Sequence, residues 1–335
     1  DAETSGVVTV NAGITTLTGT LAQVQAAFDA NDGAGVTGLD DTEAVTISDT
    51  TVAAADLNAL NAETTGAINA DSVTTLTGSA ADVITAYAAN TAGTITGLAN
   101  EALSLSGNTS VANQVTLDGK TTGIITATIT EGDLATLASL VDANTNNALT
   151  VTVTDTSVAA AALNTLDGKT SVNVTATAAT AITGTAAAIA TALSAATIDH
   201  SAANIVATVD AGSVAAADLN TINTNSDNAV NAAAATTITG SLSDVQTAYT
   251  ANTANTISGL GDEAVTLSDT GSVVATLITT LAGDTSGAVT VNAGVTTLTG
   301  TMAQVQAVHD ATNVTIDGDE AVTASDTGSV AATSI

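Results

Sequence analysis

The chain has 335 residues, of which 33 are Asp or Glu and only two are Lys or Arg, so its formal net charge is -31. Because nucleic-acid binding requires cationic side chains that displace counterions from phosphates, this composition excludes a nucleic-acid partner. The absence of cysteine excludes disulfides and cysteine-ligated metal centres. Yet 45% of the residues are apolar, which a chain disordered by high charge and low hydrophobicity lacks, so a folded protein is expected.

The predicted elements begin with a short strand that ends in Thr-Gly. β-Branched residues alternate at period two before Gly19, which favours a strand with one buried face. The same phrase closes at Gly78, Gly184, Gly240 and Gly300. A second strand phrase, which ends in Asp, closes at Asp49, Asp155, Asp210, Asp269 and Asp326. The two phrases mostly alternate and define a long unit of about 52–60 residues, made of two half-units.

A helix start follows each strand phrase. Thr20 and Gln23 have the spacing of a capping box, as do Thr301 and Gln304, whereas the Ser79 box has Asp82, a weaker third partner than Glu or Gln. After the Asp-ending phrases, short helices are expected over residues 52–58, 158–164 and 214–220, and the preceding Asp is expected to cap the helix that follows it. Other helices are expected to end in a left-handed residue at Asn31, Asn90 and Asn252.

Near-identical repeats dominate the sequence. Residues 4–26 recur at 285–307 with 20 of 23 positions identical. A four-residue strand or a ten-residue helix is not stable alone, but stacked copies bury each other's apolar faces. We therefore predict an α/β repeat, an elongated parallel β-solenoid of about twelve half-units, each of about 28 residues with a short helix. Residues 1–335 are expected to be one continuous solenoid segment of a longer repetitive chain, truncated at both ends. The pattern leaves open whether the helices lie on one side or alternately on two sides.

One stretch without charge, residues 171–198, has the length of a membrane span. It consists of Ala and Thr rather than Leu, Ile and Phe, which insert well, and it follows the repeat register. We therefore expect an ordinary repeat and no membrane span.

The sequence offers little for catalysis. Gly119-Lys120-Thr121 and Gly168-Lys169-Thr170 lack the earlier glycine of a phosphate-binding loop and are interpreted as turns. His309 stands eight residues after its cap, as Phe28 does, which indicates a packing position rather than a catalytic one. Because a nucleophilic hydroxyl needs an adjacent base, and the two histidines lie in unrelated contexts, we do not expect an enzyme.

Acidic turns precede several strand phrases. Their oxygen-rich side chains are of the kind that coordinates Ca²⁺, which takes six to eight oxygens, although no turn matches the EF-hand loop. Solvated acidic turns without an ion are the alternative interpretation. No other cofactor is expected. The calcium candidates are Asp40, Asp41, Glu43, Asp262, Glu263, Asp317, Asp319 and Glu320.

Three repeated phrases carry a resemblance to a known group of proteins. The patterns TLTGTxADVxxAY, GLGDEAVTLSD and SVAAADLNxLDGKT resemble repeats in giant secreted or surface-exposed proteins of bacteria, above all of cyanobacteria. The resemblance covers essentially the whole chain as a style of repeat rather than as an alignment to one protein. It implies an extracellular or cell-surface location, and a filament, surface layer or coat whose partners are copies of itself or neighbouring repeats.

A second hypothesis is an adhesin or ligand-binding solenoid that presents Thr-rich strand faces. Thr15, Thr74 and Thr296 share one position of the strand phrase, so stacked strands would form a regular array of hydroxyl groups. Such an array suits ice, a mineral or a cell-surface polysaccharide. The simpler explanation is that Thr favours a solvent-facing strand.

Overall fold

The computed structural model describes residues 6–11, 13–33, 35–143, 146–201 and 204–327. The chain divides into two compact units, the first made of Asp1–Val153 with Thr165–Thr175 and the second of Thr154–Asn164 with Ala176–Ile335. Both contain parallel strands and short helices that alternate along the chain, as the sequence pattern predicts.

The first unit holds the elements β1 (Val8–Thr9), β2 (Thr16–Gly19), α1 (Leu21–Asp32), β3 (Val36–Thr37), β4 (Ala44–Ile47), β5 (Thr51–Ala53), α2 (Ala54–Glu63), β6 (Ile68–Asn69), β7 (Thr75–Gly78), α3 (Ala80–Ala92), β8 (Ile95–Thr96), β9 (Ala102–Thr109), α4 (Val111–Asp118), β10 (Ile125–Ile129), α5 (Leu134–Leu137), β11 (Ala148–Thr150) and β13 (Val174–Thr175).

The second unit holds β12 (Ser157–Ala159), the start of α6 (Ala160–Asp167), β14 (Ala181–Gly184), α7 (Ala186–Ser194), β15 (Ile198–Asp199), β16 (Val206–Val209), β17 (Gly212–Ala215), α8 (Ala216–Asn225), β18 (Val230–Asn231), β19 (Ala235–Gly240), α9 (Leu242–Thr253), β20 (Ile257–Ser258), β21 (Ala264–Leu267), β22 (Gly271–Val274), α10 (Ala275–Asp284), β23 (Val289–Thr290), β24 (Val295–Gly300), α11 (Met302–Asp310), β25 (Val314–Thr315) and β26 (Ala321–Ala324).

Strands of successive half-units pair in parallel and in register. In the first unit, the sheet β2-β4-β6-β8 places Leu17 beside Val45, Val45 beside Ile68, and Ile68 beside Ile95. These partners are separated by 28, 23 and 27 positions, about one half-unit each. Val45, Ile68 and Ile95 are buried, so the apolar side chains form a continuous row inside the sheet. The predicted α/β repeat with parallel strands is thus confirmed.

The second unit follows the same rule. Its strands form the sheets β12-β14-β16-β18-β20, β17-β19-β21-β23-β25 and β22-β24-β26. Ile238 pairs with Val265, Val265 with Val289, and Val289 with Val314. The first three of these side chains are completely buried. Because a strand slipped by one residue would turn these side chains toward water, the apolar row fixes the register.

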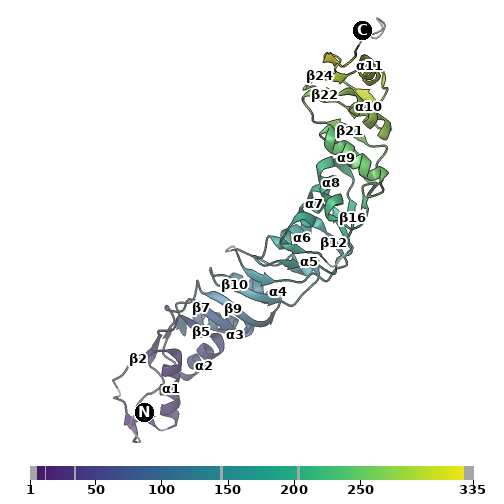
Figure 1. Cartoon of the computed structure of the whole chain (residues 1–335). Helices are drawn as coiled ribbons and strands as arrows, with labels where there is room; N and C mark the ends of the chain where they lie inside the picture. Colours follow the sequence, from purple (N-terminus) through teal and green to yellow (C-terminus); the bar gives the residue numbers. More distant parts are fainter. Residues whose placement is uncertain (1–5, 12, 34, 144–145, 202–203, 328–335) are drawn as a thin grey trace. The chain divides into compact units, whose positions relative to one another are not determined.

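Helices of successive half-units contact one another in chain order (Figure 1). In the first unit α1 contacts α2, α2 contacts α3, and α3 contacts α4; in the second, α7 to α11 form such a row. These helices therefore lie on one side of their sheets rather than alternately on two. An Asn links neighbouring helices: the Asn58 amide donates to the carbonyl of Asp82 at 2.9 Å, and the Asn220 amide donates to that of Asp244 at 3.0 Å.

The helix starts predicted at Thr20, Ser79 and Thr301 are confirmed. Complete capping boxes form at Thr20 with Gln23 and at Thr301 with Gln304. At Ser79, the hydroxyl accepts from the backbone N–H of Asp82 and donates to the Asp82 carboxyl at 2.6 Å. The shorter Asp thus bonds to the hydroxyl instead of reaching back to the backbone, which agrees with its weaker role.

The three predictions of a left-handed Asn at a helix end are wrong, because Asn31, Asn90 and Asn252 all lie within their helices. Asn90 lies within α3, which ends at the left-handed Gly93, and its amide makes two hydrogen bonds to the backbone of Leu98, at 2.9 and 3.1 Å. Asn252 binds Leu260 in the same way within α9. In each case the amide satisfies both polar groups of a loop residue eight positions on, a contact that short-range sequence rules do not anticipate.

The expected packing position at residue 309 is also wrong, because His309 is exposed and the neighbouring Val308 is buried instead. Strand β26, which follows in the same half-unit, is exposed along its length and so provides no apolar cover for a larger side chain. The uncharged stretch 171–198 forms short strands and α7. No helix within the described ranges has the length and apolar character needed to cross a membrane.

Candidate functional site: hydroxyl ladders and the contacts between half-units

A row of polar side chains follows the outward face of the sheet β2-β4-β6-β8. Thr18 pairs with Thr46, Thr46 with Asn69, and Asn69 with Thr96. Neighbouring members of the row are separated by the spacing of paired strands, about 4.8 Å. We call this row the first hydroxyl ladder. It lies on the face opposite the buried row of Val45 and Ile68, because successive side chains of a strand point to opposite faces.

The second unit carries an equivalent row, the second hydroxyl ladder, in which Thr239 pairs with Thr266, Thr266 with Thr290, and Thr290 with Thr315. Thr266, Thr290 and Thr315 are exposed, so their hydroxyls are available to a ligand. Thr15, Thr74 and Thr296, the positions predicted from the sequence, are also exposed, but none belongs to either ladder: Thr74 precedes β7 and Thr296 lies in β24, and these two strands belong to other sheets. The Thr74 hydroxyl donates to the carbonyl of Thr50 at 3.1 Å and so joins two half-units.

Buried tyrosine–glutamate pairs lie inside both units. The Tyr87 hydroxyl donates to Oε2 of Glu101 at 2.8 Å, and the Tyr249 hydroxyl donates to Oε2 of Glu263 at 3.1 Å. All four side chains are buried. Burial raises the pKa of the Tyr87 phenol well above its ordinary value, and the hydrogen bond to Glu101 adds to the rise. Burial raises the pKa of Tyr249 in the same way, with Glu263 adding to the rise.

Glu43 occupies the equivalent position in another half-unit, but the residue that corresponds to Tyr87 is Phe28, which has no hydroxyl group. Phe28 is buried, and Glu43 is 1% exposed. Oε1 of Glu43 accepts from the backbone N–H of Asp40 at 3.0 Å, whereas the buried Oε2 has no hydrogen-bond partner. Oε2 of Glu101, which accepts from Tyr87, is thus satisfied where Oε2 of Glu43 is not. At Glu263, Tyr249 and Gly261 both bind Oε2, and the buried Oε1 has no hydrogen-bond partner.

The backbone carbonyl of each buried Glu also accepts a hydrogen bond from a Thr that follows it in the chain. The Thr121 hydroxyl donates to the carbonyl of Glu101 at 2.6 Å and accepts from the N–H of Gly123 at 2.9 Å. A Cβ at Gly123 would overlap the carbonyl group of Glu101, so only glycine allows this approach. The same Thr-x-Gly contact recurs at residues 64–66 with Glu43 and at residues 285–287 with Glu263.

The strand-ending residues Asp49, Asp269 and Asp326 cap helices, but not the helices predicted. The Asp49 carboxylate accepts from the N–H of Leu21 at 2.6 Å, and the Asp269 carboxylate from that of Leu242 at 2.6 Å. These are the first residues of α1 and α9, which precede the aspartates in the chain. Helix α2, which follows Asp49, begins at Ala54, and its N-cap residue Ala53 provides no side-chain hydrogen bond. The carboxylate satisfies a free N–H of the helix in the preceding half-unit and thereby joins two half-units.

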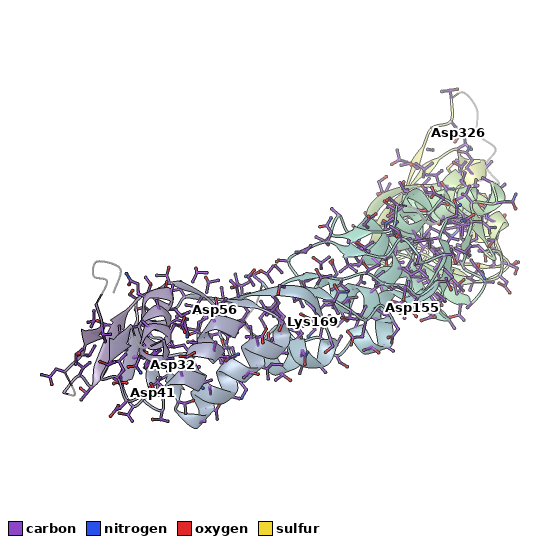
Figure 2. All side chains as sticks on the ribbon, turned by 90° about the horizontal axis from the view of Figure 1, so that it is seen from below. Asp32, Asp41, Asp56, Asp155, Lys169 and Asp326 are labelled. Carbon is purple, nitrogen blue, oxygen red and sulfur yellow. The ribbon has the colours of Figure 1, made fainter. Side chains whose placement is uncertain are left out.

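The structure separates the calcium candidates into two kinds. In each acidic turn the Glu carboxylate accepts from a nearby backbone N–H: Glu43 from Asp40 at 3.0 Å, Glu263 from Gly261 at 2.8 Å, and Glu320 from Gly318 at 3.0 Å. Glu43 and Glu263 are buried, whereas Glu320 is half-buried. The aspartates, in contrast, are exposed at residues 40, 41, 262, 317 and 319. Figure 2 shows Asp41 on the outside of the first unit.

Among the described residues, no group of three or more His, Cys, Asp or Glu side chains is arranged to hold a metal ion. Calcium binding at the turns therefore stays a prediction. The interpretation of the Gly-Lys-Thr triplets as turns is confirmed at Lys120, whose N–H donates to the carbonyl of Leu117 at the end of α4.

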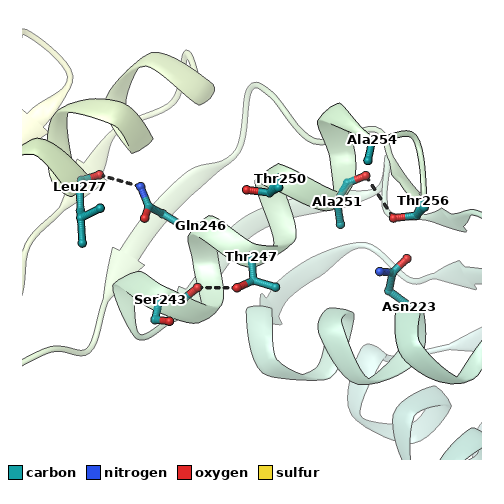
Figure 3. Close-up of a pocket in the computed structure, with 9 residues that line it drawn as sticks. All are labelled: Asn223, Ser243, Gln246, Thr247, Thr250, Ala251, Ala254, Thr256 and Leu277. Carbon is teal, nitrogen blue, oxygen red and sulfur yellow. Dashed lines mark hydrogen bonds between the residues drawn. The ribbon is translucent and has the colours of Figure 1, made fainter.

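The helix side of the second unit has a shallow hollow between α8, α9 and α10 (Figure 3). Its volume is about 560 Å³. The side chains that line it are small or uncharged, and the Gln246 amide crosses it to donate to the carbonyl of Leu277 at 3.2 Å. None of these lining side chains is titratable, so the hollow offers no acid, base or charge for catalysis.

In comparisons with protein-family models, curated proteins and solved structures, none matches this chain.

Proposed function

We propose that the chain is a stretch of a parallel β-solenoid that serves as a structural repeat segment of a giant extracellular protein. This protein forms a filament, a surface layer or a coat on a bacterial cell. The observation that carries the proposal is the in-register pairing of near-copies, from Leu17 through Ile95 and from Ile238 through Val314. A fold in which each half-unit contacts its neighbours grows by adding half-units, which suits a fibre.

Composition supports an extracellular structural role. With a formal net charge of -31, neighbouring half-units repel one another, and salt or divalent cations outside the cell screen that repulsion. Trypsin cleaves after Lys and Arg, and Lys120 and Lys169 are the two such residues in the sequence. We therefore expect the folded chain to resist trypsin, as a surface protein exposed to proteases requires.

Electron microscopy of native material tests this function. Filaments, a lattice or a coat made of the chain support it. A compact cytoplasmic protein of this length in the native cell would overturn it.

The hydroxyl ladders favour a second candidate function, an adhesin or ligand-binding solenoid for a polysaccharide, a mineral or ice. We expect Thr266→Val together with Thr290→Val to remove binding to an immobilised cell-surface polysaccharide, or to reduce thermal hysteresis. Thr247→Val, which changes a hydroxyl of α9 rather than of the sheet, is the matched control. If the wild-type chain neither binds the polysaccharide nor shows thermal hysteresis, this candidate function is refuted.

Calcium-dependent folding or assembly is tested with a chelator at constant ionic strength. If Ca²⁺ holds the acidic turns, chelation lowers the melting temperature or dissolves assemblies, because a ligand that binds the folded state stabilises it. An unchanged melting temperature and unchanged assemblies would dispose of this proposal.

A further inference from the structure

An array of polar, mostly hydroxyl side chains covers the outward face of the paired strands β9, β10 and β11 in the first unit (Figure 1). The residues of β10, Ile-Thr-Ala-Thr-Ile, alternate strictly between buried and exposed. The alternation recurs over residues 149–153, where the three apolar residues are buried and Thr150 and Thr152 are exposed. Alternate residues of a strand point to the same face, so these Thr side chains share the outward face. We call this surface the threonine array, and its members are Ser104, Asn108, Thr126, Thr128, Thr130, Thr150, Thr152 and Thr175.

The threonine array extends in two directions. Across the strands, Thr128 pairs with Asn108 on one side and with Thr150 on the other. Further along, Thr152 pairs with Thr175. Paired strands are about 4.8 Å apart, and alternate residues of one strand are about 6.6 Å apart. The polar side chains therefore repeat at a fixed spacing both along the strands and across them.

The two hydroxyl ladders differ from the threonine array, because each of them is a single row. The residue two positions before Thr46 on the same strand is Ala44, and the one before Thr266 is Ala264. The ladders therefore repeat only across the strands, whereas the array also repeats along them.

The threonine array carries no charged side chain, although the chain has 33 acidic residues. The acid that follows Thr130, Glu131, accepts at Oε2 from the N–H of Val111 at 2.9 Å and so is bound to the start of α4. A cationic protein or an ion-bearing mineral surface would bury its charges against the array without counter-charges, which is costly. The charge pattern therefore fits an uncharged partner.

The hydroxyl groups of the array are held in fixed positions. Thr is β-branched and has a restricted χ1 angle, and the buried side chains of Ile125 and Ile129 anchor the opposite face of β10. A partner that requires a regular surface therefore meets one that is already ordered, which lowers the entropic cost of binding. Small ligands, in contrast, usually bind concave sites lined by apolar and aromatic side chains. The aromatic residues of this chain, Phe28, Tyr87 and Tyr249, are all buried.

We infer that the threonine array binds the surface of ice, which is uncharged and repeats in two directions. A Thr hydroxyl donates one hydrogen bond and accepts two, so it can take the place of a water molecule at such a surface. A single polysaccharide chain repeats in one direction only and would use one row of the array. The inference deepens the second candidate function and rests on it, because it names the ligand and the face that binds it.

Thermal hysteresis of the chain in the presence of a seed ice crystal tests the inference. We expect the wild-type chain to lower the freezing temperature below the melting temperature of the crystal. Thr128→Tyr should reduce this hysteresis at least about tenfold, because a ring that stands above the array keeps the neighbouring hydroxyls from the ice surface. Thr150→Tyr, on the neighbouring strand, should have the same effect. The matched control is Thr116→Tyr, at an exposed position of α4 whose hydroxyl donates to the carbonyl of Ala112 at 2.9 Å.

Tyr is favourable in strands, so the array variants should keep the wild-type melting temperature in circular dichroism, and the loss of hysteresis should not reflect unfolding. A wild-type chain without hysteresis, or equal hysteresis in Thr128→Tyr and Thr116→Tyr, would overturn the inference. Two results would overturn it and leave the second candidate function standing. One is polysaccharide binding without hysteresis, and the other is hysteresis that Thr266→Val with Thr290→Val removes but Thr128→Tyr does not.

Discussion

Removing the Tyr87 hydroxyl tests the role of the buried tyrosine–glutamate pairs. In Tyr87→Phe, Oε2 of the completely buried Glu101 loses the bond that it accepts at 2.8 Å. A buried acceptor left without a partner costs about 1–3 kcal/mol, so we expect a loss of about 2 kcal/mol in the free energy of unfolding. The reverse change is available in the same chain, because Phe28→Tyr would supply the hydroxyl that Oε2 of Glu43 lacks.

The two substitutions have opposite expected signs and the same chemistry, so each is a control for the other. Urea unfolding followed by circular dichroism gives the overall stability, but long repeat arrays depart from two-state behaviour. Hydrogen exchange at the backbone of Ala99, whose N–H donates to Oε1 of Glu101 at 3.0 Å, gives a local measure. If Tyr87→Phe left both measurements unchanged and Phe28→Tyr brought no gain, the reasoning about the unsatisfied carboxyl oxygen would be refuted.

Three other predictions follow from the same contacts. Burial holds the pKa of Tyr87 and Tyr249 in the folded state above the unfolded value of about 10. The free energy of unfolding should therefore be unaffected by these groups below pH 10 and should fall as the pH rises above 10. A chain with Phe at both positions should lose this pH dependence when urea unfolding is measured at alkaline pH. Gly123→Ala should lower the free energy of unfolding by several kcal/mol, because the new Cβ would overlap the backbone of Glu101. Gly283→Ala, at a helix position with open space around it, should raise the free energy of unfolding by about 1 kcal/mol. Thermal melts of the two variants measure both changes. In an isolated polypeptide of residues 1–335, the identical TLTG segments of β2 and β24 should differ at least about tenfold in hydrogen exchange, because among the described strands β2 pairs with β4 alone whereas β24 pairs with β22 and β26. Equal exchange rates for the two segments would contradict this prediction.

Local chemistry explains which parts of the fold were predictable. The capping boxes at Thr20 and Thr301 involve residues three positions apart, and the strand phrases carry their own period of two, so neither depends on distant segments. The half-unit period predicted the parallel pairing because near-copies bury the same face. Only the side on which the helices lie was left open, since it depends on how closely helices approach across a half-unit.

Contacts between half-units explain the failures. The Asp49 carboxylate binds the helix 28 positions before it rather than the one after it, and the Asn90 amide binds a loop eight positions on. The sequence pattern did not predict the tyrosine–glutamate pairs, and Glu101 was not among the calcium candidates. A signal was nevertheless present, because Glu follows Tyr by 14 positions in both pairs. Such spacings have meaning only once the length of the half-unit is known from the strand register.

These contacts make each half-unit depend on the next one in the chain. The N-terminus of α1 is completed by Asp49, and that of α11 by Asp326, which accepts from Met302 at 2.7 Å. The turn at Glu101 is likewise fixed by Thr121, which comes later in the chain. A half-unit alone would leave helix N–H groups and buried carbonyls without partners, each at a cost of about 1–3 kcal/mol. Order therefore spreads along the chain through polar contacts as well as apolar burial, and a missing neighbour exposes both kinds of group at an edge.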